Sequence, residues 1–421
     1  MFPTKPENKR VIYLDHAATT ATDKEVFDVM RPYFSEHFGN PSALYSIGRG
    51  VKDAVDKARR SISNILAIQG GDSIIFTGGG TESDNMAIFG IAYKHSKNGK
   101  GHIVTTKIEH HAVLHPCERL EKEGFDITYL EPNEAGLVTE KQVKESLRED
   151  TILVSVMYAN NEMGAVEPIA DIGREILKWR KNNNTKYPYF HTDACQAAGV
   201  LDLNVEKLHV DLMTINGSKM YGPKGIGILY KRRGVSIQPL IIGGAQEMKL
   251  RAGTENVPSI IGFARALELV NEHRKKENAR LIELRQYFFN GLEKRIDKIQ
   301  INGPELGNET VRLPNNLNVS ILDIEGEALL LYLDEYGIVC STGSACTAES
   351  LDPSHVLLAC GLPYEYAHGS LRFTLGKTTT KEDIDYVLEY LPGIVEKLRE
   401  MSPVKLSTNK KNNTHPKYLQ R

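Results

Sequence analysis

The stretch SIIFTGGGTESDN, residues 73–85, decides the fold class of this chain. Its first five residues form a short apolar run that predicts a buried strand. Three glycines follow, and Thr81, Glu82 and Asp84 then open a helical pattern that extends to about residue 97. A strand that passes through glycines into a helix is typical of a βαβ unit, in which the next strand runs parallel to the first.

The same alternation continues through the first two thirds of the chain. Further strands are predicted at residues 102–106, 127–130, 152–159, 189–193, 211–215 and 225–230. Helical patterns lie between several of them, at about 111–123, 139–149 and 168–182. The sequence therefore predicts an α/β fold with a mostly parallel seven-stranded sheet and helices on both faces.

The character of the sequence changes after about residue 258. A long helix is predicted from about 259 to 297, followed by strands at 317–321, 337–341 and 370–375 and helices near 326–336 and 380–400. We interpret this part as a smaller α+β domain, formed by residues 1–22 and 266–403, beside a large domain of residues 23–265. Residues 404–421 carry five basic and no acidic side chains, which predicts a flexible tail that is either solvated or docks a partner.

Composition excludes several classes of protein. The chain has 421 residues, 41% of them hydrophobic, and a formal net charge of -2, so we expect no nucleic-acid or membrane binding. Its apolar runs are shorter than the roughly 18 residues of a membrane span, and the polar N-terminus does not resemble a signal peptide. Five cysteines in so long a chain predict free thiols in a reducing compartment, with cytoplasm as the expected location.

Three predicted strands end at the residues best suited to chemistry. The glycines before Thr81 leave backbone N–H groups at a helix start, which could cradle a phosphate, but taken alone this stretch is better explained as a tight strand-to-helix turn. Lys219 lies in NGSKMYGPKG (216–225), directly after a predicted strand. A lysine at such a place can form a Schiff base if its amine is desolvated, and a surface lysine in a loop is the alternative. Asp193 ends an apolar strand, which indicates either a ligand contact or a helix cap.

Histidines and cysteines supply further candidates. His111 and His115 have the i, i+4 spacing of a metal pair, but no HExxH or CxxC motif accompanies them, and no metal site is predicted. His110, at a strand end, is suited to stack on a flat cofactor. Cys346 lies in STGSACT (341–347), a small-residue context that favours a reactive thiol, whereas Cys340 follows an apolar run and is expected to be buried.

Taken together, these motifs resemble the NifS/IscS-like cysteine desulfurases, fold type I pyridoxal-phosphate (PLP) enzymes of the class V aminotransferase group. The resemblance runs from YLDHAATT (13–20) to LREMSP (398–403), and therefore covers nearly the whole chain. In order, it includes FGNPS (38–42), FTGGGTESDN (76–85), IEHHAV (108–113), ANNEMG (159–164), HTDACQ (191–196), SKMYGPKGIG (218–227), LRAGTENVP (250–258), STGSACT and LRFTLG (371–376).

The resemblance implies roles for particular residues. Lys219 holds PLP and moves protons, Asp193 keeps the ring nitrogen protonated, Gln196 binds the ring hydroxyl and His110 stacks on the ring and assists proton transfer. The phosphate is implied to bind Gly80 and Thr81, the Asn216 and Ser218 side chains, and Thr254 from the other subunit of a homodimer. Asn161 and Arg372 are implied to bind the substrate carboxylate, with Asn161 also beside the cofactor.

The implied reaction converts L-cysteine to L-alanine and places the sulfur on Cys346 as a persulfide. Acceptors of that sulfur are iron–sulfur scaffold proteins or carriers for tRNA thiolation. Two departures lie in the phosphate site, where Ser218 replaces a usual His and Asn216 a usual Ser; we expect PLP binding with a weaker grip on the phosphate. Tyr45 also stands where many members have His. Two alternatives stay open: a selenocysteine lyase or related class V enzyme, and a non-catalytic desulfurase-like scaffold.

Overall fold

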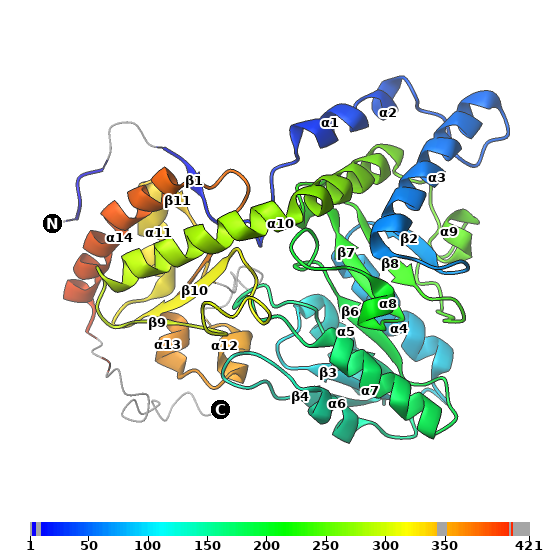
Figure 1. Cartoon of the computed structure of the whole chain (residues 1–421). Coiled ribbons are helices and arrows are strands. Elements are labelled where there is room, and N and C mark those ends of the chain that lie inside the picture. The colour runs from blue at the N-terminus through cyan, green and yellow to red at the C-terminus, as the bar shows by residue number, and fades with distance from the viewer. Residues whose placement is uncertain (1, 6–9, 343–351, 404–405, 407–421) are drawn as a thin grey trace.

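A seven-stranded sheet forms the centre of the larger part of the molecule (Figure 1). The computed structural model describes residues 2–5, 10–342, 352–403 and 406. In spatial order the strands are β2 (Ser73–Thr77), β8 (Gly227–Lys231), β7 (Leu212–Asn216), β6 (Tyr189–Asp193), β5 (Thr151–Ser155), β3 (His102–Thr106) and β4 (Asp126–Leu130). Strand β8 runs antiparallel to both of its neighbours, and the other adjacent pairs are parallel.

Helices cover both faces of this sheet because its strands are apolar on both sides. Ile75 and Leu229 pack with α4 (Gly80–His95) and α5 (His111–Lys122) on one face, whereas Ile74 and Phe76 face the opposite core. The helices that contribute to that second core are α1 (Lys24–Met30), α3 (Ser46–Leu66), α6 (Glu140–Ser146), α7 (Ile169–Asn182), α8 (Val205–Leu208) and α10 (Val257–Glu293). Short helices α2 (Pro32–Ser35) and α9 (Gln246–Lys249) lie in connecting segments.

A second, smaller group of strands and helices has its own core. Strands β12 (Ser370–Thr374), β10 (Asn316–Ile321) and β9 (Ile299–Ile301) form an antiparallel sheet, and β1 (Ile12–Tyr13) pairs in parallel with β11 (Ile338–Val339). This core also takes side chains from α11 (Gly326–Glu335) and α14 (Lys381–Met401). Helices α12 (His355–Ala359) and α13 (Tyr364–His368) pack on a further small cluster.

Helix α10 connects the two parts. Figure 1 shows it running from the large sheet, where it packs against α1 and α3, to the smaller part, where it packs against α14. The domain boundary that we predict at residue 265 lies inside this 37-residue helix and stays a proposal. Pairing of β1 with β11 supports grouping residues 1–22 with the C-terminal part. Leu406, in the predicted tail, donates to Asp323 and accepts from Lys298.

The fold class predicted from the sequence is confirmed, and several element ends are corrected. The strand predicted at 152–159 ends at Ser155, and the one predicted at 337–341 is a two-residue strand. The helix predicted at 139–149 ends at Ser146. None of the helices in the described part of the chain is both long and apolar enough to cross a bilayer.

Candidate functional site

The carboxyl ends of the parallel strands bring most of the predicted site residues to one edge of the large sheet. This arrangement follows from topology, because parallel strands present the loops after them at the same edge. The residues end or follow β2 (Gly80 and Thr81), β3 (His110), β5 (Asn161), β6 (Asp193 and Gln196) and β7 (Asn216, Ser218 and Lys219).

Lys219 ends a single 3-10 turn, η1 (Gly217–Lys219), directly after β7. Its Nζ donates to the backbone carbonyl of Ala18 at 2.5 Å, and Gln196 Nε2 donates to the carbonyl of Ala17 at 3.0 Å. Lys219 and Gln196 also line one cavity of about 340 Å³ together with His16. The N-terminal segment therefore fixes the amine and the amide that we predict to contact the cofactor.

Asp193 is buried at the end of β6 and accepts a hydrogen bond from the backbone N–H of Cys195 at 2.8 Å. Burial, and then the charge of Asp193, raise the pKa of buried Asp84 well above its usual range. Burial also raises the pKa of Glu109 to about 8 and lowers that of His191 to about 4. Near pH 7 Glu109 and His191 are therefore largely uncharged. The sequence offered no signal that these two residues and Asp84 lie near Asp193.

The glycine turn before α4 is closely packed on one side and open on the other. A Cβ added at Gly80 would lie 2.9 Å from Cys195 Sγ and 3.4 Å from Asn216 Cβ. On the open side, Gly80, Thr81, Asn216 and Ser218 line a common cavity of about 640 Å³. The structure therefore brings the four predicted phosphate-binding residues of this chain together.

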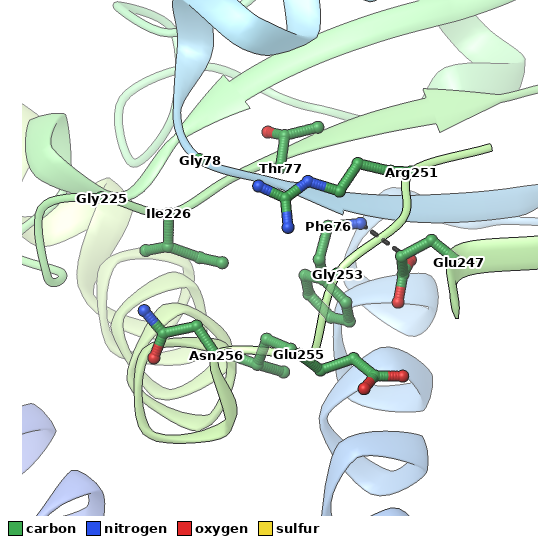
Figure 2. A pocket seen from close by; sticks show the side chains of 11 residues that line it. Phe76, Thr77, Gly78, Gly225, Ile226, Glu247, Arg251, Gly253, Glu255 and Asn256 are labelled. Carbon is green, nitrogen blue, oxygen red and sulfur yellow. Dashed lines mark hydrogen bonds between the residues drawn. The ribbon is translucent and has the colours of Figure 1, made fainter. Parts of the chain in front are cut away.

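A small pocket of about 110 Å³ lies behind the glycine turn, and Figure 2 shows Arg251 and Glu247 beside it. Glu82 accepts from the backbone N–H of Gly78 at 2.7 Å and from Arg251 Nε at 2.9 Å. Glu247 accepts from the backbone N–H of Phe76 at 2.9 Å (Figure 2). These contacts attach the segment that carries exposed Thr254 to the glycine turn of the same chain. Within one chain, Thr254 does not line the cavity shared by the other phosphate candidates.

His110 caps the N-terminus of α5, with its Nδ1 accepting from the backbone N–H of Ala112 at 3.0 Å. Burial lowers the pKa of His110, so a neutral ring is favoured. The ring of His111 lies 4.7 Å from those of both His115 and His355, measured between centroids. Within the described ranges, no group of three or more His, Cys, Asp or Glu side chains has a geometry suited to a metal ion.

Arg372 lies on β12 of the smaller part and is almost fully buried. Its Nη1 donates to the backbone carbonyl of Asn161 at 3.0 Å, and its Nη2 donates to the Asp15 carboxylate at 2.6 Å. Arg372 and Asn161 are therefore in contact, through the backbone of Asn161. Asp15 is a contact that the sequence interpretation missed, although it lies in the YLDHAATT motif.

Cys346 lies outside the described residues, so its predicted role rests on sequence. Cys117, Cys195, Cys340 and Cys360 are buried free thiols. Burial raises the pKa of all four, to about 12 for Cys360. Since the thiolate is the nucleophilic form, none of these four described cysteines is suited to that role. The predicted burial of Cys340 is confirmed.

The residues at this edge fit a phosphorylated pyridoxal. The glycine turn borders an open cavity, and the Asn216 and Ser218 side chains that also line this cavity offer hydrogen-bond donors. Asp193 supplies a buried carboxylate and Lys219 an amine held by a carbonyl.

Comparison with known proteins agrees with this chemistry. Residues 12–387 match the family described as aminotransferase class-V. Cysteine desulfurase IscS of Dictyoglomus turgidum (strain DSM 6724 / Z-1310) is 52% identical over 397 residues, covering 94% of this chain and 98% of the relative. The protein of the same name from Methanosarcina thermophila is 51% identical, with coverages of 94% and 95%.

Solved structures give the same result. A NifS-like protein superposes with a TM-score of 0.84 at 36% identity, covering 92% of this chain and all of the other chain. A NifS-like protein from Rickettsia africae ESF-5 has a TM-score of 0.80 at 30% identity, with the same coverages. Fold and site together define a fold type I enzyme of the aminotransferase class-V family, to which this chain belongs. Within that family it is a NifS/IscS-like cysteine desulfurase.

Proposed function

We propose that this enzyme uses PLP to convert L-cysteine to L-alanine and delivers the sulfur, through a persulfide on Cys346, to an acceptor protein. The observation that carries the proposal is the meeting of Lys219, Asp193 and the glycine turn at one sheet edge, with Arg372 reaching Asn161 from the smaller part. When bound, PLP supplies an electron sink for the pair left by removal of the Cα proton.

The residues of the chain have separate tasks in this reaction. Lys219 would hold PLP through its amine and, once free, would move the Cα proton, and the Ala18 carbonyl beside its Nζ would give the freed amine a fixed position. Asp193, a buried carboxylate at the end of β6, would pair with the ring nitrogen and keep it protonated. His110 would stack on the ring and assist proton transfer.

The remaining cofactor and substrate contacts divide between the two parts of the chain. Gln196 binds the ring hydroxyl, and Gly80, Thr81, Asn216 and Ser218 bind the phosphate. The guanidinium of Arg372 binds the substrate carboxylate, with Asn161 beside it. The Cys346 thiolate then attacks the substrate sulfur, the carbon–sulfur bond breaks, and a proton added to carbon completes L-alanine.

We propose a homodimer in which Thr254 reaches the phosphate of the partner subunit. Thr254 is exposed and separate from its own chain's phosphate cavity, which supports a contact made across an interface. Large apolar side chains are also exposed in two segments, at Phe27, Phe34, Phe38, Leu44, Tyr45 and Ile47 and at Ile241, Ile242 and Met248. Exposed apolar patches of this kind are typical of interfaces.

The sulfur acceptors that we propose are an iron–sulfur scaffold or a carrier for tRNA thiolation. The group that contains this chain includes relatives named IscS, and the small-residue context of Cys346 suits a persulfide that must be handed to another protein. The unpaired buried thiols support a reducing compartment, for which we propose the cytoplasm.

Incubation of the purified protein with PLP and L-cysteine, with alanine and sulfide both measured, tests the proposal. We expect Cys346→Ala to keep the cofactor absorbance and lose sulfide release, while Cys117→Ala, which removes a buried thiol, keeps both. Sulfide release retained by Cys346→Ala would instead favour a selenocysteine lyase or related enzyme. A wild-type protein that binds no PLP and forms no alanine would favour the non-catalytic scaffold.

A further inference from the structure

The guanidinium of Arg372 is already engaged by groups of its own chain. Nη2 donates to Asp15 Oδ1 at 2.6 Å and Nη1 to the Asn161 carbonyl at 3.0 Å. The side chain of Arg372 is 3% exposed and that of Asp15 is 15% exposed. A carboxylate ligand would therefore meet an arginine whose two terminal nitrogens each have one partner.

The third nitrogen of Arg372 is a further donor beside this ion pair. Nε of Arg372 is buried and meets no hydrogen-bond acceptor among the described residues. A buried donor without a partner costs free energy, so structural arginines usually have each N–H satisfied. Together Nε and the second hydrogens of Nη1 and Nη2 leave three N–H groups for an incoming ligand.

The backbone around Asp15 and Arg372 is fixed from several sides. Asp15 forms a parallel bridge to Thr374, two residues from Arg372 on the same strand. Arg372 pairs with Asn318 on β10 and, through backbone hydrogen bonds in both directions, with Ser341. The carboxylate of Asp15 is thus held at a set place beside the guanidinium, so it restricts rotation of that group about its long side chain.

We propose that Asp15 is a positioning residue that orients Arg372 for the substrate carboxylate. The Asp15 and Asn161 contacts hold Nη2 and Nη1, and this leaves Nε–H and one neighbouring N–H as the pair that receives the carboxylate bidentately. The inference rests on the proposed role of Arg372 and adds the residue that sets its geometry. Asp15 acts through Arg372 and makes no contact with the reacting atoms.

Binding of two amines that differ in one group tests this inference. L-alanine carries the carboxylate and ethylamine lacks it, and both are titrated against the PLP-loaded protein by the change in its visible absorbance. We expect Asp15→Asn to weaken L-alanine binding about tenfold, as loss of a well-oriented charged hydrogen bond does, and to leave ethylamine binding unchanged. Three results would each overturn the inference: equally weakened binding of both amines, unchanged binding of both, or tighter binding of L-alanine.

A double-mutant cycle with Arg372→Lys separates this inference from the proposed function. We expect Arg372→Lys to remove most of the preference for L-alanine, and Asp15→Asn to have no further effect on that preference in the lysine background. If Arg372→Lys leaves the preference intact, the proposed role of Arg372 is wrong. If Arg372→Lys removes the preference for L-alanine but Asp15→Asn alone leaves that preference unchanged, only the role of Asp15 is wrong.

A second variant covers the case in which Asp15→Asn does not fold. Asp15→Glu retains the charge that a buried arginine requires but displaces the carboxylate by one methylene. Thermal melting of the protein without PLP reports folding independently of ligand binding. A folded Asp15→Glu protein is expected to bind L-alanine more weakly and ethylamine as before, and wild-type affinity for both would overturn the proposal.

Discussion

Replacing Gly80 with alanine tests how closely the glycine turn is packed against the strand ends below it. The added Cβ would lie 2.9 Å from Cys195 Sγ, a separation that real Cβ atoms essentially never show, and 3.4 Å from Asn216 Cβ, which is tighter than usual or at the edge of ordinary contact. Cys195 is buried, so its sulfur cannot move into solvent. Either the Cys195 side chain or the start of α4 must therefore shift.

The expected cost follows from two opposing effects. Overpacking of a well-packed site costs roughly 1–3 kcal/mol. Alanine is favoured over glycine in a helix by at most about 1 kcal/mol, and less at the first helical residue, where Gly80 lies. We therefore expect Gly80→Ala to lower the free energy of unfolding by about 1–2 kcal/mol and to weaken PLP binding.

Two matched variants give this prediction its control. Cys195→Ala removes the sulfur, so the double variant Gly80→Ala/Cys195→Ala should recover about 1 kcal/mol relative to the sum of the single changes. Gly50→Ala places a Cβ in open space inside α3, and there we expect a stabilisation of roughly 0.5–1 kcal/mol. Urea unfolding of the protein without PLP measures all four variants. Zero coupling between residues 80 and 195, with full PLP affinity in Gly80→Ala, would refute the reasoning.

Three further predictions concern the lysine, a buried histidine and the tail. Lys219→Ala should abolish the visible absorbance of the PLP-treated protein, and a variant that keeps it would exclude Lys219 as the attachment point. Burial lowers the pKa of His191 to about 4 from an ordinary value of 6.5. Between these pH values the unfolded chain therefore binds more protons than the folded chain. The free energy of unfolding falls as the pH drops through this range. Between pH 7 and 5, the free energy of unfolding of His191→Gln should therefore fall by about 2 kcal/mol less than that of the wild type, as measured by urea unfolding. His37→Gln, at an exposed histidine, is the control. A His191→Gln protein whose free energy of unfolding depends on pH as the wild type's does would contradict this. Deletion of 407–421, which keeps Leu406, should leave both alanine formation and sulfur transfer unchanged if the tail is a solvated end, and loss of transfer alone would identify a docking segment.

The sequence predicted the sheet well because its strands are short apolar runs bounded by glycines and polar residues. The orientation of β8 was not predictable in this way, since a buried antiparallel strand has the same apolar pattern as a parallel one. Helix α3 was missed, although its buried residues Val51, Val55, Ala58, Ile62 and Leu66 follow the 3.6-residue period and could have revealed it.

The site was predictable where a particular side chain follows a strand, as Asp193 and Lys219 do. It was not predictable where the partner is a backbone carbonyl, because every residue carries one and the sequence does not distinguish Ala18 from its neighbours. Nor does the sequence indicate that Asp84 and Glu109 lie near Asp193, since that proximity depends on how α4 and the segment after β3 pack.

The contact between Asp15 and Arg372 also determines when, during synthesis of the chain, the carboxylate-binding site can form. The two residues are 357 positions apart, and β1 pairs with a strand near residue 338. At about 5–20 residues per second, a ribosome needs roughly 20–70 s to make the intervening chain. During that time β1 has no native partner strand. Because β1 has only two residues, it exposes little strand edge to which a non-native strand could pair. Closure of the carboxylate site is therefore one of the last events of folding.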